Sequence, residues 1–154
     1  MISSKYQIFI DKAEDTLSSF IGLKTQFVSS SKQSINTDIA QKSILSTIVF
    51  SGEISGDLTL LFPIETAVSA LEFLLGEKVR LTNIALLKDG IGELSNIVMG
   101  AVKTQFDEIN KKVAFELPVT YKGIDEIYNN IILQDGVWIK MKLQEKPFYM
   151  FISQ

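Results

Sequence analysis

One stretch of the chain, 89–103, carries the residues whose types and spacing could do chemistry. On a helix at about 100° per residue, the polar side chains of this stretch, DGIGELSNIVMGAVK, share one face. That face, called the polar stripe below, consists of Asp89, Glu93, Asn96, Gly100 and Lys103. An asparagine amide both donates and accepts hydrogen bonds, so it can orient a water molecule without titrating. A glutamate one turn away can pair with a cation.

The opposite face of this stretch is apolar and predicts a buried helix surface. It is formed by Ile84, Leu87, Ile91, Leu94, Val98 and Val102, with Gln105 at its end. The polar stripe should therefore face water. Each glycine in a helix costs about 1 kcal/mol relative to alanine, so Gly90, Gly92 and Gly100 should have a reason to be there. Alternatively, Gly90 and Gly92 mark a break between two helices, and the stripe begins later.

The residue types that the chain lacks restrict its chemistry. It has no cysteine, which excludes thiol catalysis, disulfides and cysteine-ligated metals. It has no histidine, the commonest general base and metal ligand. Any catalysis must use carboxylates, amides, hydroxyls or lysines, and we expect no metal site and no cofactor of the chain's own.

Charge and hydropathy argue against nucleic acid and membranes as partners. The net charge is −3 and Arg80 is the single arginine, whereas phosphate binding needs clustered basic residues. The N-terminus, MISSKYQIFIDKAED, reads as the start of an amphipathic helix instead of a signal peptide. No window is long and apolar enough for a membrane span. We expect a cytoplasmic protein that binds neither nucleic acid nor membrane.

Apolar periodicity predicts both helices and strands. Helical spacing covers 6–21, 64–75 and about 83–110. Strand patterns cover 44–51, 57–62, 113–123, 127–134, 137–143 and 148–153, with a short possible strand at 24–29. GEISG and Asp135-Gly136 are hairpin signals, and Pro118 indicates an edge or a bulge. We therefore predict an α+β fold, a mainly antiparallel β-sheet covered by long helices.

The order of these elements indicates a weak internal two-fold repeat within a single domain, 1–154. The possible halves are 1–76 and 83–154, each with a helix, a strand and a hairpin, although their sequence identity is slight. With 46% apolar residues the chain can fill one core. Trp138 faces away from the apolar side of its strand, which a second packed layer or a dimer contact explains better than a ligand platform.

At GELSNIVMGAVK the chain resembles the CheX branch of the CheC/CheX/FliY family of bacterial chemotaxis phosphatases. The family motif is an Asp or Ser, three residues, Glu, two residues, Asn, and a later proline. Asp89, Glu93 and Asn96 match it in place, and Pro118 stands twenty-two positions after Asn96. The upstream run SGEISGDLTLLFPIETAVSALEFLLGE also looks like the family. Members of the CheC type carry two such sites, whereas this chain has one, as in CheX.

The resemblance implies a CheC-like fold and a homodimer that dephosphorylates CheY, a receiver protein that stores its signal as an aspartyl phosphate. The implied catalytic residues are Asn96, which would position the attacking water, and Glu93, which would pair with the receiver's lysine. Mg²⁺ is expected on the phosphorylated partner only. Docking to the receiver is implied for the remaining candidates, Asp89, Gly92, Gly100 and Lys103. Pro118 is interpreted as structural.

Two other interpretations stay open at this point. A glutamate and an asparagine three apart on an exposed helix are, without the resemblance, most often a solvated surface. The same fold could also serve without turnover, as a receiver-binding or flagellar-switch adaptor module. The intact Glu93 and Asn96 pair favours the enzyme.

Overall fold

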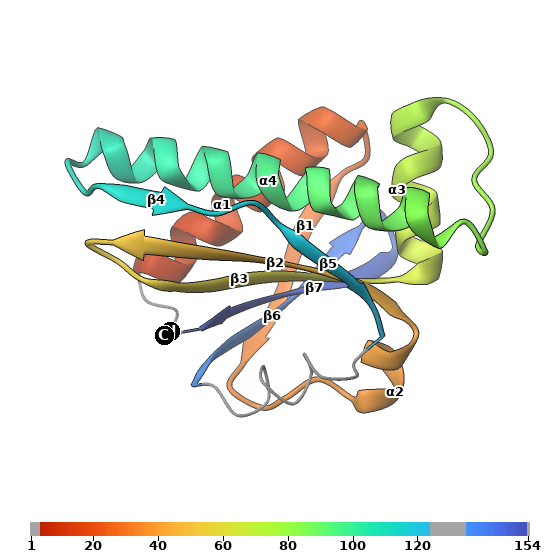
Figure 1. The fold of residues 1–154 in the computed structure, drawn as a ribbon, viewed down its shortest axis with the longest axis horizontal. Coiled ribbons are helices and arrows are strands. Elements are labelled where there is room, and N and C mark those ends of the chain that lie inside the picture. The colour runs from red at the N-terminus through yellow and green to blue at the C-terminus, as the bar shows by residue number, and fades with distance from the viewer. Residues whose placement is uncertain (1–3, 124–134, 154) are drawn as a thin grey trace.

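The computed structural model describes residues 4–123 and 135–153, which form one antiparallel sheet with long helices on one face (Figure 1). The helices are α1 (Ser4–Ile21), α2 (Thr37–Gln41), α3 (Ile64–Leu75) and α4 (Ile84–Glu108). The strands are β1 (Thr25–Ser31), β2 (Ser43–Gly52), β3 (Gly56–Pro63), β4 (Val113–Phe115), β5 (Val119–Lys122), β6 (Gly136–Leu143) and β7 (Lys146–Ser153). The α+β class and the three long helices predicted from periodicity are confirmed.

The sheet interleaves the two halves of the chain. Its order among the described strands is β1-β6-β7-β3-β2-β4, with β5 also paired to β2, and every pairing is antiparallel. The first strand of each half therefore pairs with the hairpin of the other half, and β3 meets β7 at the centre. This arrangement has the two-fold pattern that the order of elements indicated, while duplication of the halves stays a prediction.

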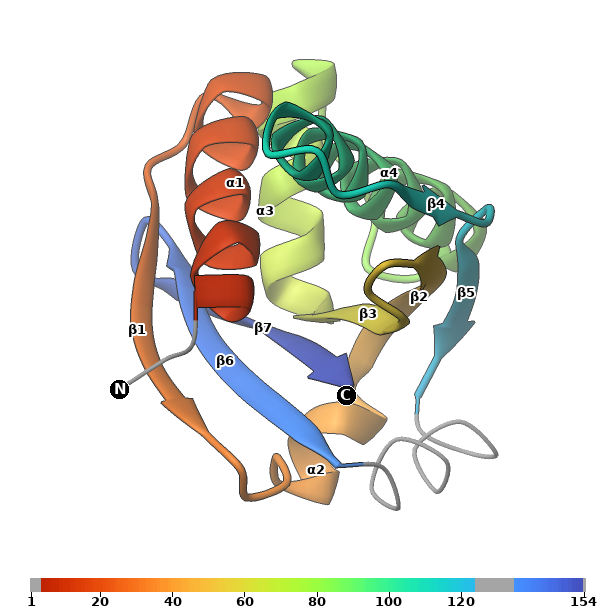
Figure 2. The ribbon, with the colours of Figure 1, turned by 90° about the vertical axis from the view of Figure 1, so that its left-hand side faces the viewer.

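The main core lies between the sheet and the helices α1, α3 and α4. Figure 2 shows α1 and α4 side by side above the strands, with α3 behind them. The ring of Phe9 in α1 lies 5.6 Å from that of Phe50 in β2 and 6.5 Å from that of Phe106 in α4. Burying side chains of this size stabilises a fold by about 1.5–3 kcal/mol each. This cluster of three rings therefore helps to hold α1 and α4 against the sheet.

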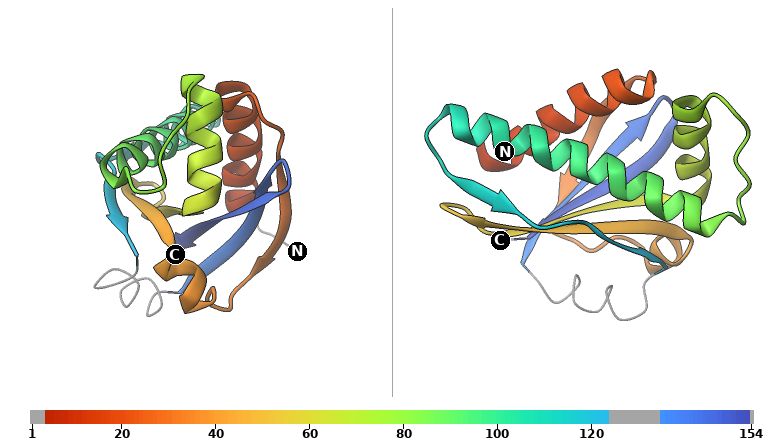
Figure 3. Two further views of the ribbon diagram at one scale, coloured as in Figure 1. Left: turned by 90° about the vertical axis from the view of Figure 1, so that its right-hand side faces the viewer. Right: turned by 45° about the horizontal axis from the view of Figure 1, so that its top comes forward.

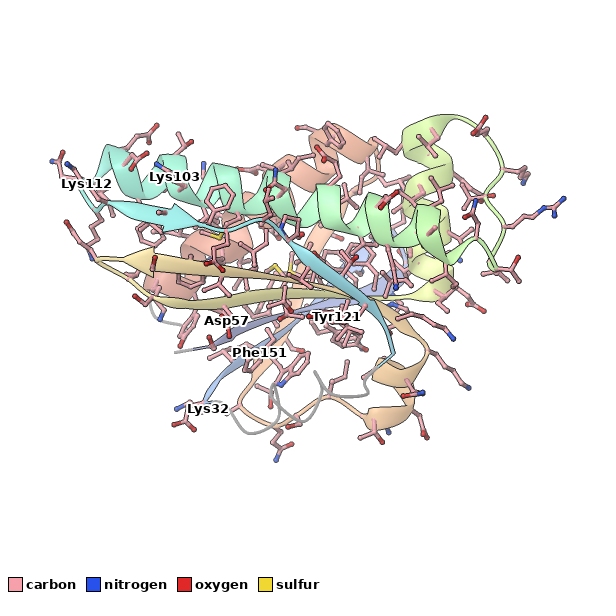
Figure 4. All side chains as sticks on the ribbon, in the orientation of Figure 1. Lys32, Asp57, Lys103, Lys112, Tyr121 and Phe151 are labelled. Carbon is pink, nitrogen blue, oxygen red and sulfur yellow. The ribbon has the colours of Figure 1, made fainter. Side chains whose placement is uncertain are left out.

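The other face of the sheet carries a smaller apolar layer. Trp138 is 5% exposed, and its ring lies 4.9 Å from that of Phe151. Phe151 lies on the side of the sheet away from α4 (Figure 4). Ala40 of α2 packs with Leu45 and Leu61 in the same cluster. Trp138 therefore belongs to a second packed layer, which is one of the two interpretations that the sequence allowed.

The neighbours of β6 differ from those that the Asp135-Gly136 signal predicts. From Trp138 to Leu143, β6 pairs with β7 along one edge and with β1 along the other, so no edge is left there for a further strand. Its hairpin partner is β7. The two strands are joined by Gln144 and Glu145, and Gln144 has a positive φ of 57°. The expected partner strand, 127–134, lies outside the described residues.

Two smaller features refine the predictions for the loops. Helix α2, only five residues long, was not expected; the Asn36 side chain caps it by accepting from the Asp38 amide at 2.7 Å. The strand predicted at 113–123 is divided into β4 and β5, and Pro118 lies between them, as its lack of an amide hydrogen favours. Within the described ranges, no helix has the length and apolarity needed to cross a bilayer.

Candidate functional site

The helix that carries the polar stripe is continuous. α4 runs from Ile84 to Glu108, and the side chain of Asn83 caps its start by accepting from the Leu86 amide at 3.2 Å. The alternative of a helix break at Gly90 and Gly92 is therefore wrong. A continuous helix keeps the residues of the stripe in register along one line.

Burial separates the two faces of α4 as the sequence predicts. Leu87, Ile91, Leu94, Val98 and Val102 are all fully buried. On the polar stripe, Asp89 and Glu93 are exposed, whereas Asn96, Gly100 and Lys103 are partly buried. Figure 3 shows α4 lying along the outside of the molecule, above β5. The stripe is thus open to a partner protein.

The centre of the stripe is free of contacts from the polar groups that the structure describes. In the described part of the chain, the side chains of Asp89, Glu93 and Asn96 make no hydrogen bond and no ion pair. Lys103 differs, because its Nζ lies 2.9 Å from Oδ2 of Asp107, with the two side chains 39% and 48% exposed. An exposed pair of this kind contributes only about 0.3–0.5 kcal/mol, so a partner could displace it.

Gly92 lies off the exposed stripe and is buried. A Cβ at this position would meet Cγ2 of Thr120 at 3.1 Å and Cγ of Pro118 at 3.9 Å, both from the β5 side. Its surroundings are therefore this chain's own strand, whereas a Cβ at Gly100 would meet nothing within 4 Å. Of the candidates for partner contact, Gly100 has the open surroundings that such a role needs.

Beneath the stripe, two buried serines join α4 to the sheet, and sequence reasoning missed both. Oγ of Ser46 in β2 lies 2.6 Å from Oγ of Ser95, and Oγ of Ser95 donates to the Gly92 carbonyl at 2.8 Å. Both side chains are fully buried. The available signal was a serine inside the motif at a helix position that faces the core.

The other features of the structure lie away from the stripe. A cavity of about 630 Å³ lies between α2, the start of α3 and β7, lined by Lys42, Ile64, Leu81 and Tyr149 among others. Burial raises the pKa of the Tyr149 hydroxyl, and burial lowers the pKa of Lys5 at the start of α1. The described residues contain no cluster of three or more acidic side chains that could hold a metal ion.

Comparison of the sequence with family models gives a match over more than half of the chain. The sequence model of the family described as "Chemotaxis phosphatase CheX" matches residues 44–142. The chain belongs to the CheX family. Comparison with curated protein sequences gave no match.

Solved structures of CheX-like proteins share the fold over nearly the whole chain. The chemotaxis protein CheX of Vibrio vulnificus has a TM-score of 0.79 and 18% identity, and the match covers 98% of this chain and 99% of that one. CheX in the CheX–CheY–BeF3–Mg²⁺ complex of Borrelia burgdorferi has a TM-score of 0.77 and 18% identity, with 97% of each chain covered. FliY of Thermotoga maritima has a TM-score of 0.69 and 14% identity, with 99% of this chain and 91% of that one covered. These likenesses show a CheC/CheX-like fold.

Proposed function

We propose that this CheX-family chain hydrolyses the aspartyl phosphate of a CheY-type receiver protein and so terminates a chemotaxis signal. The observation that carries the proposal is the pair Glu93 and Asn96, three residues apart on the outer face of a continuous helix and without side-chain partners among residues 4–123 and 135–153. Membership of the CheX family supports it. The Borrelia burgdorferi relative was solved with CheY, BeF3 and Mg²⁺, which supports the choice of partner.

Asn96 would act on the water. In the reaction, a water oxygen attacks the phosphorus, the bond from phosphorus to the aspartate oxygen breaks, and inorganic phosphate leaves. Such a step depends mostly on positioning and on stabilisation of charge. The Asn96 amide can accept a hydrogen bond from the water and donate one to a phosphoryl oxygen, so it would hold the water in line. Mg²⁺ and a lysine beside the phosphate would come from the receiver.

Glu93 would set how the receiver docks. Its carboxylate lies one turn before Asn96 on the same stripe and has no partner in the described part of the chain, so it can pair with the receiver's lysine. Asp89 and Lys103 extend the stripe at its two ends and would tune docking. Gly100 would let the receiver's backbone approach α4, because the space above it is open.

The test is phosphate loss from an Mg²⁺-bound phosphorylated receiver, with and without the purified protein. We expect Asn96→Ala to lower kcat by about 100-fold with little change in KM, because it removes the group that orients the water. Glu93→Ala should also remove most of the activity and, in addition, raise KM. Glu108→Ala, an exposed glutamate of α4 off the polar stripe, is the matched control and should behave as wild type. Wild-type rates in both site variants would refute these roles.

A non-catalytic role is the second candidate, because the fold also occurs in the FliG–FliM complex of H. pylori, at a TM-score of 0.66 and 10% identity. An adaptor of this fold would bind a receiver or a flagellar component without turnover. It predicts tight binding of the phosphorylated receiver with no faster loss of phosphate. The same assay, combined with a binding measurement, therefore separates the two functions.

We also propose that the protein is a homodimer. Among the described strands, β1 and the β4–β5 side are the two ends of the sheet, and an uncovered edge can pair with another chain. Phe27 and Val28 are exposed on the first edge, and Leu117 and Val119 on the second. The cytoplasmic location expected from the sequence stays a prediction.

A further inference from the structure

The turn of α4 that carries Glu93 and Asn96 is tied to the sheet by a chain of hydroxyls. Ser95 donates its single hydroxyl hydrogen to the Gly92 carbonyl, so the bond between the two serines must be donated by Ser46. In an α-helix, the carbonyl of Gly92 also accepts the amide of Asn96, four residues on. The chain of hydroxyl hydrogen bonds that starts at Ser46 therefore ends at the Gly92 carbonyl, which also accepts the hydrogen bond from the Asn96 amide.

The same turn touches β5 at a second point. The space beside Gly92 is so small that a Cβ would lie 3.1 Å from Cγ2 of Thr120, tighter than ordinary van der Waals contact. Pro118, just before β5, borders the same position. α4 thus approaches β5 at Gly92 more closely than a residue with a Cβ would ordinarily allow.

The two contact points are neighbours in the sheet. Ser46 of β2 and Thr120 of β5 are paired residues in the antiparallel ladder, so their side chains lie on the same face. Ser46 is fully buried and also pairs with Leu60 of β3, which places it inside the sheet and not at its edge. Two adjacent strands therefore present one rigid surface to the turn from Gly92 to Asn96.

We propose that Ser46 and Thr120 form a seat for this turn and act as positioning residues for Glu93 and Asn96. The inference rests on the proposed phosphatase function and adds to it the residues that set the depth and angle of the catalytic pair. Neither residue belongs to the polar stripe. Catalysis by positioning is sensitive to small displacements, since a shift of about 1 Å can cost about 100-fold in rate. Gly92 belongs to the seat because its lack of a side chain permits the contact.

The decisive experiment adds a methyl group at Gly92 and then removes the methyl group of Thr120 that it would meet. Gly92→Ala should push the turn off β5 and lower kcat by about tenfold or more, while the higher helix propensity of alanine offsets part of the packing cost to stability. Thr120→Ser removes Cγ2, the atom that the new methyl would meet. The double variant Gly92→Ala/Thr120→Ser should recover most of the lost kcat. A double variant no better than Gly92→Ala, as expected if Gly92 contacted the receiver directly, would overturn the proposal.

The hydroxyl chain is tested by a matched pair of substitutions on β2. Ser46→Ala removes the donor beneath α4 and should lower kcat severalfold, with KM little changed. Thr47→Val removes a hydroxyl pair on the opposite face, where Oγ1 of Thr47 lies 2.8 Å from Oγ1 of Thr59, and should leave kcat as in wild type. Equal effects of the two variants on kcat would mean that the hydroxyl chain supports only stability, and would contradict its positioning role.

A readout that does not depend on turnover keeps this inference separate from the proposed function. The side-chain amide signals of Asn96 in a ¹⁵N correlation spectrum should shift in Gly92→Ala and Ser46→Ala, return toward wild type in the double variant, and stay in place in Thr47→Val. If the wild-type protein accelerates no phosphate loss, the proposed function fails. The amide signals still test whether Ser46 and Thr120 position the turn that carries Asn96. Signals unmoved by Gly92→Ala would refute it.

Discussion

Asn96 and Glu93 illustrate how a chain without histidine or cysteine could still catalyse a hydrolysis. An amide orients a water through hydrogen bonds of fixed direction, and a carboxylate pairs with a cation, so neither group has to exchange a proton with the substrate. Both side chains are without partners in the described chain, so no internal bond has to break when a receiver docks. The receiver would bring the metal, the lysine and the phosphate, which leaves this chain to supply geometry.

The glycines of α4 show that one residue type can serve three purposes. Gly90 faces Leu71 of α3, Gly92 faces Thr120 of β5, and Gly100 faces open space. All three weaken the helix by about the same amount, close to 1 kcal/mol relative to alanine. Their surroundings, and not their propensity, therefore decide what a substitution does.

Gly100→Ala should stabilise the protein and weaken its binding to the receiver. Alanine raises the free energy of unfolding by up to about 1 kcal/mol in a helix, and a methyl at this position meets nothing within 4 Å. If the receiver's backbone lies close to α4 there, the dissociation constant for the receiver activated with Mg²⁺ and beryllofluoride should rise severalfold. Urea denaturation and calorimetric titration measure the two effects. Unchanged affinity would remove Gly100 from the docking surface.

At the scale of elements, the position of α4 is set from three sides. α3 packs against it at Gly90, β5 at Gly92 and β2 through Ser95. A fourth element, α1, also packs against α4, where Phe9 meets Phe106, and the face with the polar stripe is left open. These contacts hold the turn with Glu93 and Asn96 at one end of a buried framework, so the pair can be placed accurately without intrachain bonds of its own.

Gly90→Ala should destabilise the fold, in contrast to Gly100→Ala. A methyl at Gly90 would overlap the buried side chain of Leu71. Overpacking costs about 1–3 kcal/mol, and the gain of about 1 kcal/mol in helix propensity offsets only part of it. We expect a net loss of about 1 kcal/mol in urea denaturation. In a Leu71→Ala background, the same substitution should become neutral or stabilising; a loss of equal size there would show that Leu71 is not the cause.

At the scale of the whole molecule, the interleaved sheet makes the two halves depend on each other. β1 from the first half pairs with β6 from the second, and β5 from the second pairs with β2 from the first. The halves 1–76 and 83–154 therefore cannot be separate domains in this fold, whatever their origin. The single domain predicted for 1–154 accords with this pattern and stays our proposal.

Fragments 1–76 and 83–154 should each fail to fold alone. Each fragment would lack the cross-strand neighbours of its own first strand, and β3 and β7 would each expose an unpaired edge at the centre of the sheet. Circular dichroism should show no cooperative unfolding transition for either fragment, whereas an equimolar mixture should regain one. A cooperative transition in one isolated fragment would contradict this interdependence.

Light scattering at micromolar concentration should give a mass of twice the 17.2 kDa of the chain. A lysine at an exposed position of the edge that forms the dimer should return the mass to that of the monomer, because it places a charge in the new interface. Val28→Lys tests β1, and Val119→Lys tests the β4–β5 side. A wild-type monomer would refute the homodimer, and a dimer that persists in both variants would exclude pairing through either edge.

Local patterns in the sequence were enough to predict the three long helices and the polar stripe. The spacing of apolar residues in α4 depends on neighbours three and four positions away, and Gly76, with φ of 71°, ends α3 as a helix-capping glycine should. The hairpin of β2 and β3 is equally local. The lack of histidine and cysteine needs no structure at all. These features are determined by contacts within a few residues of the chain.

The tertiary structure alone decided which distant segments meet. It made β1 and β7 the neighbours of β6, buried Trp138 against Phe151, and brought Ser46 and Thr120 together beneath Gly92. Gly92 and Gly100 look alike in the sequence, yet one lies against a strand and the other faces open space. Such differences depend on packing between residues far apart in the chain, which no local period encodes. The sequence by itself therefore predicted Glu93 and Asn96 as the catalytic pair, and the fold showed which residues pack beneath their turn of α4.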